Sequence, residues 1–246
     1  MQFELLPVLD AMLQLYEQPR NIDRFRDYLQ LLQGGSKGEM HLPIGGFNPM
    51  AKSHVQEALL QLKNLDAEQI ASNALQAVNK TCYTIKPGAV FNLALNLSDD
   101  VQGGWTNRYS SDYDSKFRFH GLMNKGFTVA VFWVSESFSK TLIETRVLEY
   151  LHRTIYWLRH GKPLTLQDHL AQELYVAKQL PPDGHSHDEA MESVAAYYRQ
   201  YANTEDYGII FNFFYGDEAS VALGMPCYGT QQSFTGFEYA KGCACM

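Results

Sequence analysis

Glutamate and histidine recur at helical spacing in the second half of the chain. Glu149 and His152 lie three residues apart, and His169 and Glu173 lie four residues apart. Side chains at these spacings share one face of an α-helix, and an E-x-x-H pair is the unit with which di-metal carboxylate bundles hold their ions. If the short connection at residues 161–164 folds the two helices antiparallel, both pairs face one cleft. These residues therefore predict a site for Zn²⁺, Fe²⁺ or Mn²⁺, a divalent metal that could activate water or oxygen.

These four residues also have an ordinary structural interpretation. Glu and His on an amphipathic helix commonly form its solvated face, and the chain contains no second E-x-x-H with which to complete a di-metal pattern. An H-x-H sequence, His185 and His187, follows a Pro- and Gly-containing stretch and could either join the metal site or lie exposed. Both interpretations of the four residues, a metal site and a solvated helix face, stay open.

The segment 103–114 is a second candidate, because it interleaves aromatic, amide, guanidinium and carboxylate groups. Segments next to sheet ends commonly contact ligands, since aromatic rings pack on the ligand and a few polar groups orient it. Arg108 could clamp a carboxylate or a phosphate. The expected contacts of a small-molecule ligand are Trp105, Asn107, Arg108, Tyr109 and Asp112. Alternatively, the aromatic residues cover the end of the core and the polar ones form turns.

The charge balance argues against nucleic acid as a partner. The chain has 20 Lys and Arg residues against 27 Asp and Glu residues, which leaves a formal net charge of −7. Affinity for nucleic acid depends largely on clustered basic residues, which release counterions from the phosphates. Most of the imbalance lies in residues 163–206, where Lys178 and Arg199 face eight acidic residues. We therefore expect a small-molecule ligand and no nucleic acid.

The chain shows no targeting or membrane signal. Its longest apolar run, residues 127–134, is far shorter than the roughly 18 residues that span a bilayer. The first residues lack the basic and apolar regions of a secretory signal, and the four cysteines include no C-x-x-C pair. We therefore expect a soluble cytoplasmic protein with reduced thiols and no membrane contact.

Periodicity predicts an α+β fold in a single globular domain, residues 1–246. Residues 1–80 form a helical N-terminal layer, and residues 81–246 form a sheet with further helices. Residues 81–85 and 89–97 are strand-like on either side of a Lys-Pro-Gly turn, which predicts a hairpin. Residues 127–134 and 207–215 are apolar on both alternations and predict central strands covered on both faces. The result is a mixed sheet of about four or more strands, with three consecutive helices inserted before the last central strand.

Capping signals predict where several helices begin. Asn48 before Pro49 and Asp66 before Gln69 predict the starts of two helices in the first half, the first of which carries Val55, Leu59 and Leu62 on one face. In the second half, helix starts are predicted at three Thr or Ser residues that precede an acidic residue by three places: Thr141, Thr165 and Ser186.

Two functions of different classes stay open. The first is a cytosolic metal-dependent enzyme that acts on a small polar substrate, with Glu149, His152, His169 and Glu173 as ligands and Arg108 as the clamp. The second is a metal-free small-molecule-binding or protein-interaction domain that uses the aromatic loop 103–114. The familiar motifs H-E-x-x-H and G-x-G-x-x-G are missing from the sequence, so neither of them names a reaction.

Overall fold

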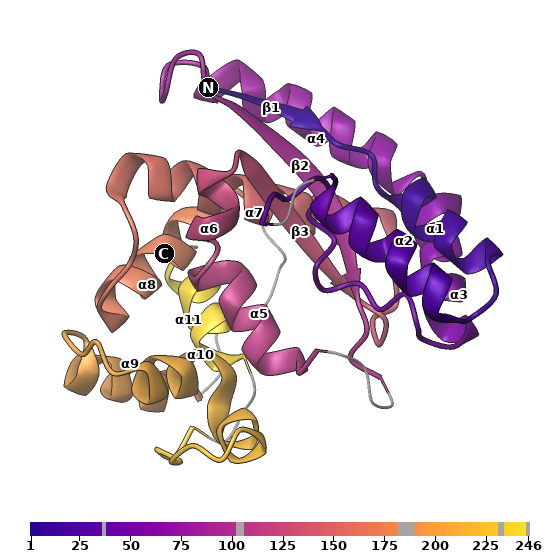
Figure 1. The fold of residues 1–246 in the computed structure, drawn as a ribbon. Helices are drawn as coiled ribbons and strands as arrows, with labels where there is room; N and C mark the ends of the chain where they lie inside the picture. Colours follow the sequence, from indigo (N-terminus) through magenta and orange to yellow (C-terminus); the bar gives the residue numbers. More distant parts are fainter. Residues whose placement is uncertain (36–37, 102–105, 182–189, 231–233, 245–246) are drawn as a thin grey trace. The chain divides into compact units, whose positions relative to one another are not determined.

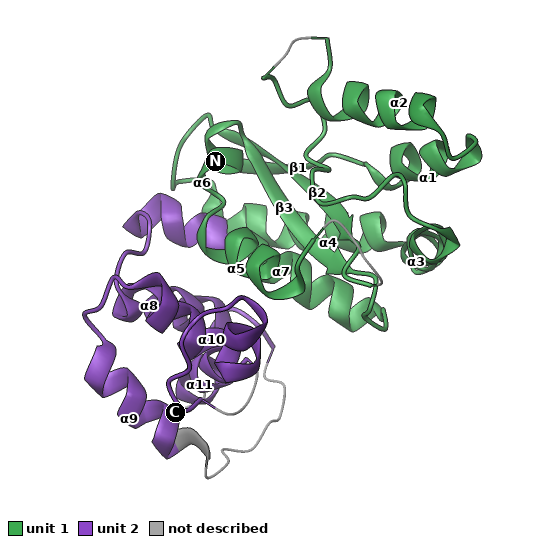
Figure 2. Cartoon of the chain, turned by 60° about the horizontal axis from the view of Figure 1, so that its bottom comes forward, with its two compact units in different colours: residues 1–151 green, residues 152–246 purple. Residues whose placement is uncertain are grey.

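The chain forms two compact units, Met1–Leu151 and His152–Met246 (Figure 2). The computed structural model describes all residues except 36–37, 102–105, 182–189, 231–233 and 245–246 (Figure 1). The described residues form eleven α-helices and three β-strands, which confirms a protein of mixed helix and strand. The single domain expected over residues 1–246 stays a prediction.

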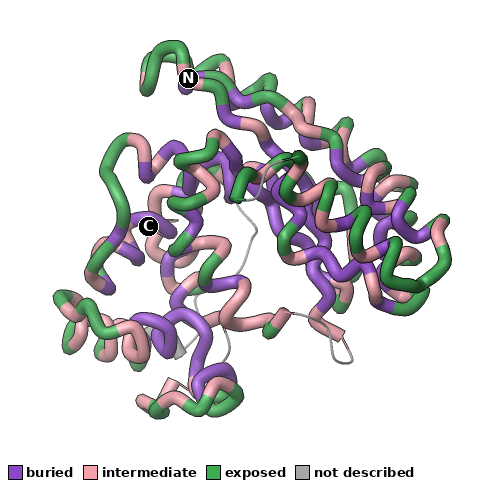
Figure 3. The backbone as a smooth tube through the Cα atoms, viewed as in Figure 1, coloured by how far each residue is buried: buried purple, intermediate pink, exposed green. Residues whose placement is uncertain are grey.

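Unit 1 is built on a parallel sheet. Its described strands are β1 (Gln2–Leu5), β2 (Val90–Ser98) and β3 (Phe127–Trp133), in the order β1-β2-β3. Phe3 of β1 lies beside Phe91 of β2 in the register. All seven residues of β3 and the last six of β2 are buried, so helices and loops cover both faces of these two strands. Figure 3 colours the buried parts of the backbone purple. The expected burial is therefore confirmed for residues 127–133, but the predicted central position is wrong, because β3 lies at an edge of the described sheet, beside β2.

The helices of unit 1 carry the chain back between parallel strands, because parallel neighbours cannot be joined by a tight turn. Four helices connect β1 to β2: α1 (Leu9–Glu17), α2 (Ile22–Gln33), α3 (Ser53–Asn64) and α4 (Ala67–Cys82). Two more connect β2 to β3, and a third follows β3: α5 (Arg108–Phe117), α6 (His120–Asn124) and α7 (Lys140–His160), whose last residues belong to unit 2. Val55, Leu59 and Leu62 are buried on one face of α3, as the sequence predicts.

Unit 2 consists of helices in its described residues. They are the end of α7, α8 (Leu166–Ala177), α9 (Ala190–Tyr201), α10 (Tyr207–Ala222) and α11 (Thr235–Ala244). The predicted capping box at the start of α8 is confirmed, since the Thr165 side chain accepts from Asp168 N and the Asp168 carboxylate accepts from Thr165 N. Gly161, which ends α7, has the positive φ of 83° that favours glycine after a helix. No helix in the described parts of the chain is both long and apolar enough to cross a bilayer.

The predicted sheet is wrong in strand number and pairing. The described sheet has three parallel strands instead of four or more of mixed direction. The predicted hairpin is replaced by the end of α4 and a turn, and β2 pairs with β1 at the N-terminus, within the segment expected to be helical. The predicted strand 207–215 is part of α10. Residues 210–216 are all buried, so this stretch of the helix has no face in solvent, and its apolar pattern resembles that of a buried strand.

One predicted helix start is wrong, and another is confirmed in position but not in its side-chain cap. Asn48 does not begin α3, because its side chain serves a turn and a distant strand end: Oδ1 accepts from Met50 N at 3.0 Å and Nδ2 donates to Asp99 Oδ2 at 3.2 Å. Helix α4 directly follows Asp66, as predicted, but Asp66 has a left-handed φ of 56° and makes no side-chain cap bond to the helix. The Asn48 side chain was identified from its local pattern, which does not show the tertiary contacts that compete for it.

The predicted start of α7 can be compared with the structure, whereas that of α9 cannot. Helix α7 begins at Lys140, and the Oγ of Ser139 accepts from Leu142 N at 3.1 Å, so Thr141 lies inside the first turn instead of capping it. The predicted start of α9 at Ser186 lies outside the described residues, and the helix is seen from Ala190.

The loop of residues 44–48 passes close over the end of β2 and depends on a glycine there. A Cβ atom on Gly46 would lie 2.4 Å from Ser98 Oγ and 2.8 Å from Asn96 Nδ2, whereas a Cβ on Gly45 would meet nothing within 4 Å. Ser98 and Asn96 are buried, so neither can move away into solvent. The close approach fixes this loop against the carboxyl end of β2.

We predict that Gly46→Ala lowers the free energy of unfolding by about 1–3 kcal/mol, because the methyl group overpacks a buried contact. Gly45→Ala is the matched control, and its effect should stay within about 0.5 kcal/mol. Urea denaturation followed by circular dichroism measures both. Equal effects of the two substitutions would show that the loop does not pack as described.

Candidate functional site

Polar residues gather in unit 1 at the carboxyl ends of β2 and β3. Ser98 ends β2 and is followed at once by Asp99 and Asp100, and Trp133 ends β3. In parallel sheets covered by helices, ligands bind outside the carboxyl ends of the strands, where the loops converge. We call these residues and their polar partners the carboxyl-edge cluster. Its members are Asn48, His54, Asn96, Ser98, Asp99, Asp100, Arg108, Trp133, Glu136 and Arg146.

The Asp99 carboxylate is the most buried charge of this cluster, with 2 % of its surface exposed. Its Oδ1 accepts from His54 Nε2 at 3.2 Å and from Val101 N at 3.1 Å, and its Oδ2 accepts from Asn48 Nδ2. Because a carboxylate can only accept, it holds the proton of a neutral His54 on Nε2 and leaves Nδ1 as the basic nitrogen. The His54 side chain is 32 % exposed, so it can meet a molecule from solvent. A histidine oriented by a buried carboxylate is suited to general acid–base catalysis.

Two guanidinium groups and two carboxylates form the second part of the cluster. Arg108 pairs with Asp100 through NH1 at 3.1 Å and with Glu136 through NH2 at 2.9 Å. Its guanidinium carbon lies 4.6 Å from the centroid of the Trp133 ring. Arg146 reaches the same Glu136 oxygen at 3.0 Å. The positive charges of this part are thus already balanced by carboxylates of the protein.

Several buried polar atoms of the carboxyl-edge cluster have no hydrogen-bond partner among the described residues. They are Asn96 Oδ1, Arg108 Nε and Trp133 Nε1. Buried polar atoms are paired in the great majority of cases, because an unpaired one loses its hydration without compensation. An acceptor and two donors at one end of the sheet can therefore be satisfied by a bound polar molecule or by ordered water.

The residues predicted to contact a ligand have mixed outcomes. Asn107 caps α5, since its Oδ1 accepts from Ser110 N at 3.1 Å, and Asp112 is buried and pairs with Lys116 Nζ at 2.6 Å. Arg108 joins the carboxyl-edge cluster, whereas Tyr109 is half-buried in the first turn of α5. Trp105 lies outside the described residues. Ligand contact by these residues stays a prediction, and Arg108 is the one that lies among the unpaired atoms.

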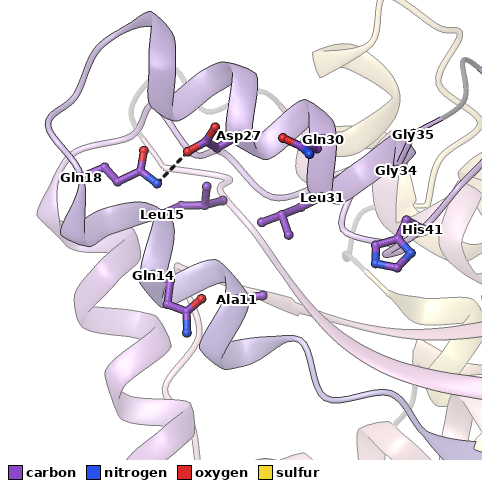
Figure 4. A pocket seen from close by; sticks show the side chains of 10 residues that line it. All are labelled: Ala11, Gln14, Leu15, Gln18, Asp27, Gln30, Leu31, Gly34, Gly35 and His41. Carbon is purple, nitrogen blue, oxygen red and sulfur yellow. Dashed lines mark hydrogen bonds between the residues drawn. The ribbon is translucent and has the colours of Figure 1, made fainter.

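A groove lies between α1 and α2 of unit 1 (Figure 4). It has a volume of about 580 Å³, and three glutamines and two ionisable residues are among those that line it: Gln14, Gln18, Gln30, Asp27 and His41. Gln18 Nε2 donates to Asp27 Oδ2 at 2.8 Å. The Gln18 carbonyl accepts from Arg24, which also donates to the Pro49 carbonyl next to Asn48 of the cluster. Arg24 thus connects the segment after α1 with the loop that carries Asn48.

The predicted metal ligands divide between the two units, with Glu149 in unit 1 and the other three in unit 2. Glu149 lies 4.0 Å from Arg146 Nε. Glu173 is buried and pairs with buried Arg153 through two bonds, Nε to Oε1 at 2.9 Å and NH2 to Oε2 at 2.6 Å. His169 Nδ1 lies 2.7 Å from the Thr165 carbonyl. The Glu173 oxygens are therefore engaged with a cation of the protein itself.

His152 is buried, and its Nδ1 has no hydrogen-bond partner among the described residues. Its ring centroid lies 6.1 Å from that of Tyr175. Burial, helped by the charge of Arg159, lowers the pKa of His152 to about 4. Because removal from water disfavours the charged form, this histidine stays neutral at physiological pH.

Within the described residues, no three His, Cys, Asp or Glu side chains lie together so that they could hold a metal ion. His185 and His187, the pair that could have joined the site, lie outside those residues. Binding of Zn²⁺, Fe²⁺ or Mn²⁺ by Glu149, His152, His169 and Glu173 stays a prediction.

Sequence reasoning missed His54 and Asp99. The two residues are 45 positions apart, so no local spacing connects them. One signal was present: Asp99 and Asp100 directly follow a predicted strand, and in a parallel sheet such residues lie at the ligand-binding edge. A predicted hairpin hid that signal, because it paired residues 89–97 with an antiparallel neighbour.

We predict that Glu173→Gln destabilises unit 2 by about 3–5 kcal/mol, because it leaves the buried Arg153 guanidinium without its counter-charge. The matched control is Glu192→Gln, which breaks an exposed pair with Arg199 and should cost less than about 1 kcal/mol. Thermal and urea denaturation measure both. A loss at Glu173 no larger than at Glu192 would contradict the buried pair.

We further predict a pH dependence of stability that His152 causes. The unfolded histidine has a pKa of about 6.5 and the folded one of about 4, so between these values the unfolded chain binds a proton that the folded chain does not. The contribution of this group is therefore complete above about pH 6.5 and falls as the pH falls toward 4, by about 3 kcal/mol in all.

The measurement is urea denaturation at neutral pH and at about pH 4.5, where His152→Gln should lose about 2 kcal/mol less than the wild type between the two conditions. His160→Gln, which changes an exposed histidine of the same helix, should keep the wild-type difference. An unchanged pH dependence in His152→Gln would disprove the buried neutral imidazole.

Comparison with known proteins adds no assignment. No protein-family model matches the chain, no curated protein matches it, and no solved structure matches it. The assignment of a function therefore rests on the geometry of the two units.

Proposed function

We propose that unit 1 binds a small polar molecule at the carboxyl-edge cluster and that His54 exchanges a proton with it. The observation that carries this proposal is the buried Asp99 carboxylate, which holds the Nε2 of a partly exposed histidine. A buried charge is costly unless it is paired, and pairing to a solvent-facing imidazole orients that imidazole for proton transfer. The unpaired atoms of Asn96, Arg108 and Trp133 supply an acceptor and two donors for the same molecule.

The charges of the cluster favour a ligand that is neutral or zwitterionic. Arg108 and Arg146 already face Asp100 and Glu136, and Asp99 adds a further carboxylate. A carboxylate or phosphate ligand would have to displace these protein carboxylates from Arg108, because the cluster offers it no guanidinium that is not already paired. The charges therefore favour Arg108 as a hydrogen-bond donor, held over the Trp133 ring, over its expected role as an anion clamp.

This proposal follows the metal-free alternative of the two predicted functions and adds acid–base chemistry to it. A metal-dependent reaction stays a prediction about the Glu and His residues of α7 and α8. Metal binding has less support than the proposed function, because the carboxylate of Glu173, one of the predicted ligands, is engaged with the buried Arg153 guanidinium.

We predict that at least one neutral or zwitterionic compound raises the melting temperature of the wild type by about 3 °C at tenfold excess over its Kd. The panel contains neutral amino acids, polyols and nucleosides, with acetate and phosphate as anions. The shift should disappear in His54→Gln and Arg108→Gln. It should persist in Arg118→Gln, which breaks an exposed ion pair next to the end of α5.

A second measurement is independent of the ligand. Two-bond ¹H–¹⁵N correlation spectra should show the His54 proton on Nε2 in the wild type, and Asp99→Asn should weaken that preference. The proposal is wrong if no panel compound stabilises the protein, or if stabilising compounds act equally on His54→Gln and the wild type.

A further inference from the structure

Unit 2 contains a cavity of about 640 Å³ that none of the predicted functions uses. It is bordered by α9 and by the segment around residue 228. Three tyrosines line it, Tyr197 and Tyr201 from α9 and Tyr228 from the loop, together with polar residues that include Gln200 and Thr230. Its volume lies within the range of small-molecule sites.

The three tyrosine rings stand at steep angles to one another. The centroids of Tyr197 and Tyr201 are 4.9 Å apart. The Tyr228 ring lies at 86° to that of Tyr197 and at 69° to that of Tyr201, with centroid distances of 6.2 Å and 6.3 Å. Aromatic faces carry negative charge density, and rings that meet nearly at right angles surround a ligand from more than one side.

The electrostatic surroundings of the tyrosines are acidic. No Lys, Arg or His is among the residues that the structure shows lining the cavity. Asp206 and the Tyr228 hydroxyl lie beside the same glycine, since a Cβ on Gly208 would be 3.2 Å from Asp206 Oδ1 and 3.8 Å from the Tyr228 oxygen. Burial, with the carboxylates of Asp217 and Asp206 among the smaller causes, raises the pKa of Tyr197, so this ring stays a neutral phenol. The surroundings thus favour positive charge.

The tyrosines are held in place before any ligand arrives. The Tyr197 hydroxyl donates to the Ile209 carbonyl at 3.0 Å. Asp217 fixes the loop that carries Tyr228: its Oδ1 accepts from Tyr228 N at 3.0 Å and from Asn212 Nδ2 at 2.8 Å, and its Oδ2 accepts from Gly229 N at 3.1 Å. These bonds lower the pKa of Asp217 although burial alone would raise it, so the carboxylate stays charged. A preformed site loses less entropy when it binds.

We propose that this tyrosine cavity binds a quaternary ammonium cation. Such a cation is bulky and weakly hydrated, so ring faces can replace its water at little cost, and the nearby Asp206 attracts its charge. A primary ammonium needs hydrogen-bond acceptors on every side, which a wall of tyrosine rings does not supply. The site involves unit 2 alone and is independent of the function proposed for unit 1.

The test compares choline with its neutral isostere 3,3-dimethyl-1-butanol by isothermal titration calorimetry on the full chain. The two probes have nearly the same shape and differ in charge. We expect choline to bind at least about tenfold more tightly than the isostere, as a partly desolvated cation–π contact allows. Tyr228→Leu should abolish choline binding, and Tyr228→Phe should retain it, because the aromatic ring remains.

Asp206→Asn separates charge from structure, because asparagine still caps α10 while the charge is removed. Its affinity for choline should fall severalfold, and added salt should reduce the difference from the wild type. Tyr83→Leu, at an exposed position in unit 1, is the control for loss of a tyrosine and should bind as the wild type does. Circular dichroism checks that each variant folds. If Tyr228→Leu does not fold, Tyr228→Phe and Asp206→Asn still test the proposal.

Three results would overturn the proposal. Equal affinity for choline and the isostere would make the cavity merely apolar. Wild-type choline binding by folded Tyr228→Leu would place the cation elsewhere. No heat of binding up to about 50 mM choline, a concentration far above that at which weak cation sites fill, would show that the cavity takes no such cation.

Discussion

The parallel pairing of β2 with both β1 and β3 is the constraint on which unit 1 depends. Parallel strands run in one direction, so the chain must return along helices after each strand, and every strand ends at the same edge of the sheet. The residues that follow β2 and β3 therefore meet although they are far apart in the sequence. His54 from α3 and Glu136 from the segment after β3 join them there. The carboxyl-edge cluster is a direct result of this topology.

Buried charges distinguish the two candidate locations. In unit 2, Arg153 and Glu173 satisfy each other through two hydrogen bonds, so their contribution is structural. In unit 1, Asp99 is equally buried but accepts from the Asn48 amide, the Val101 backbone and a histidine that faces solvent. Chemistry at a protein site requires a polar group with capacity left for a second molecule. The His54–Asp99 pair has that capacity.

Unit 2 shows how a buried helix can prepare a surface for binding. Helix α10 is buried through residues 210–216, and its geometry breaks at Gly216, where φ is 79°. The next residue, Asp217, turns its carboxylate to the backbone of Tyr228 and Gly229. The break in the helix thus positions an acceptor for the loop, and the loop positions a ring of the tyrosine cavity. The apolar core and the tyrosine cavity are thus connected through one residue, Asp217.

The sequence by itself determined the elements whose signals are local. The α8 capping box, the buried face of α3 and the buried strand β3 each depend on residues a few positions apart, and each was found. Only the tertiary structure decided that β1 pairs with β2, that residues 207–215 are helical and that His54 meets Asp99. These features depend on which distant segment supplies a hydrogen-bond partner or excludes water. A segment buried on all sides shows no periodicity that distinguishes a strand from a helix. Asp99 is 45 residues from His54, so no local sequence pattern predicts their contact.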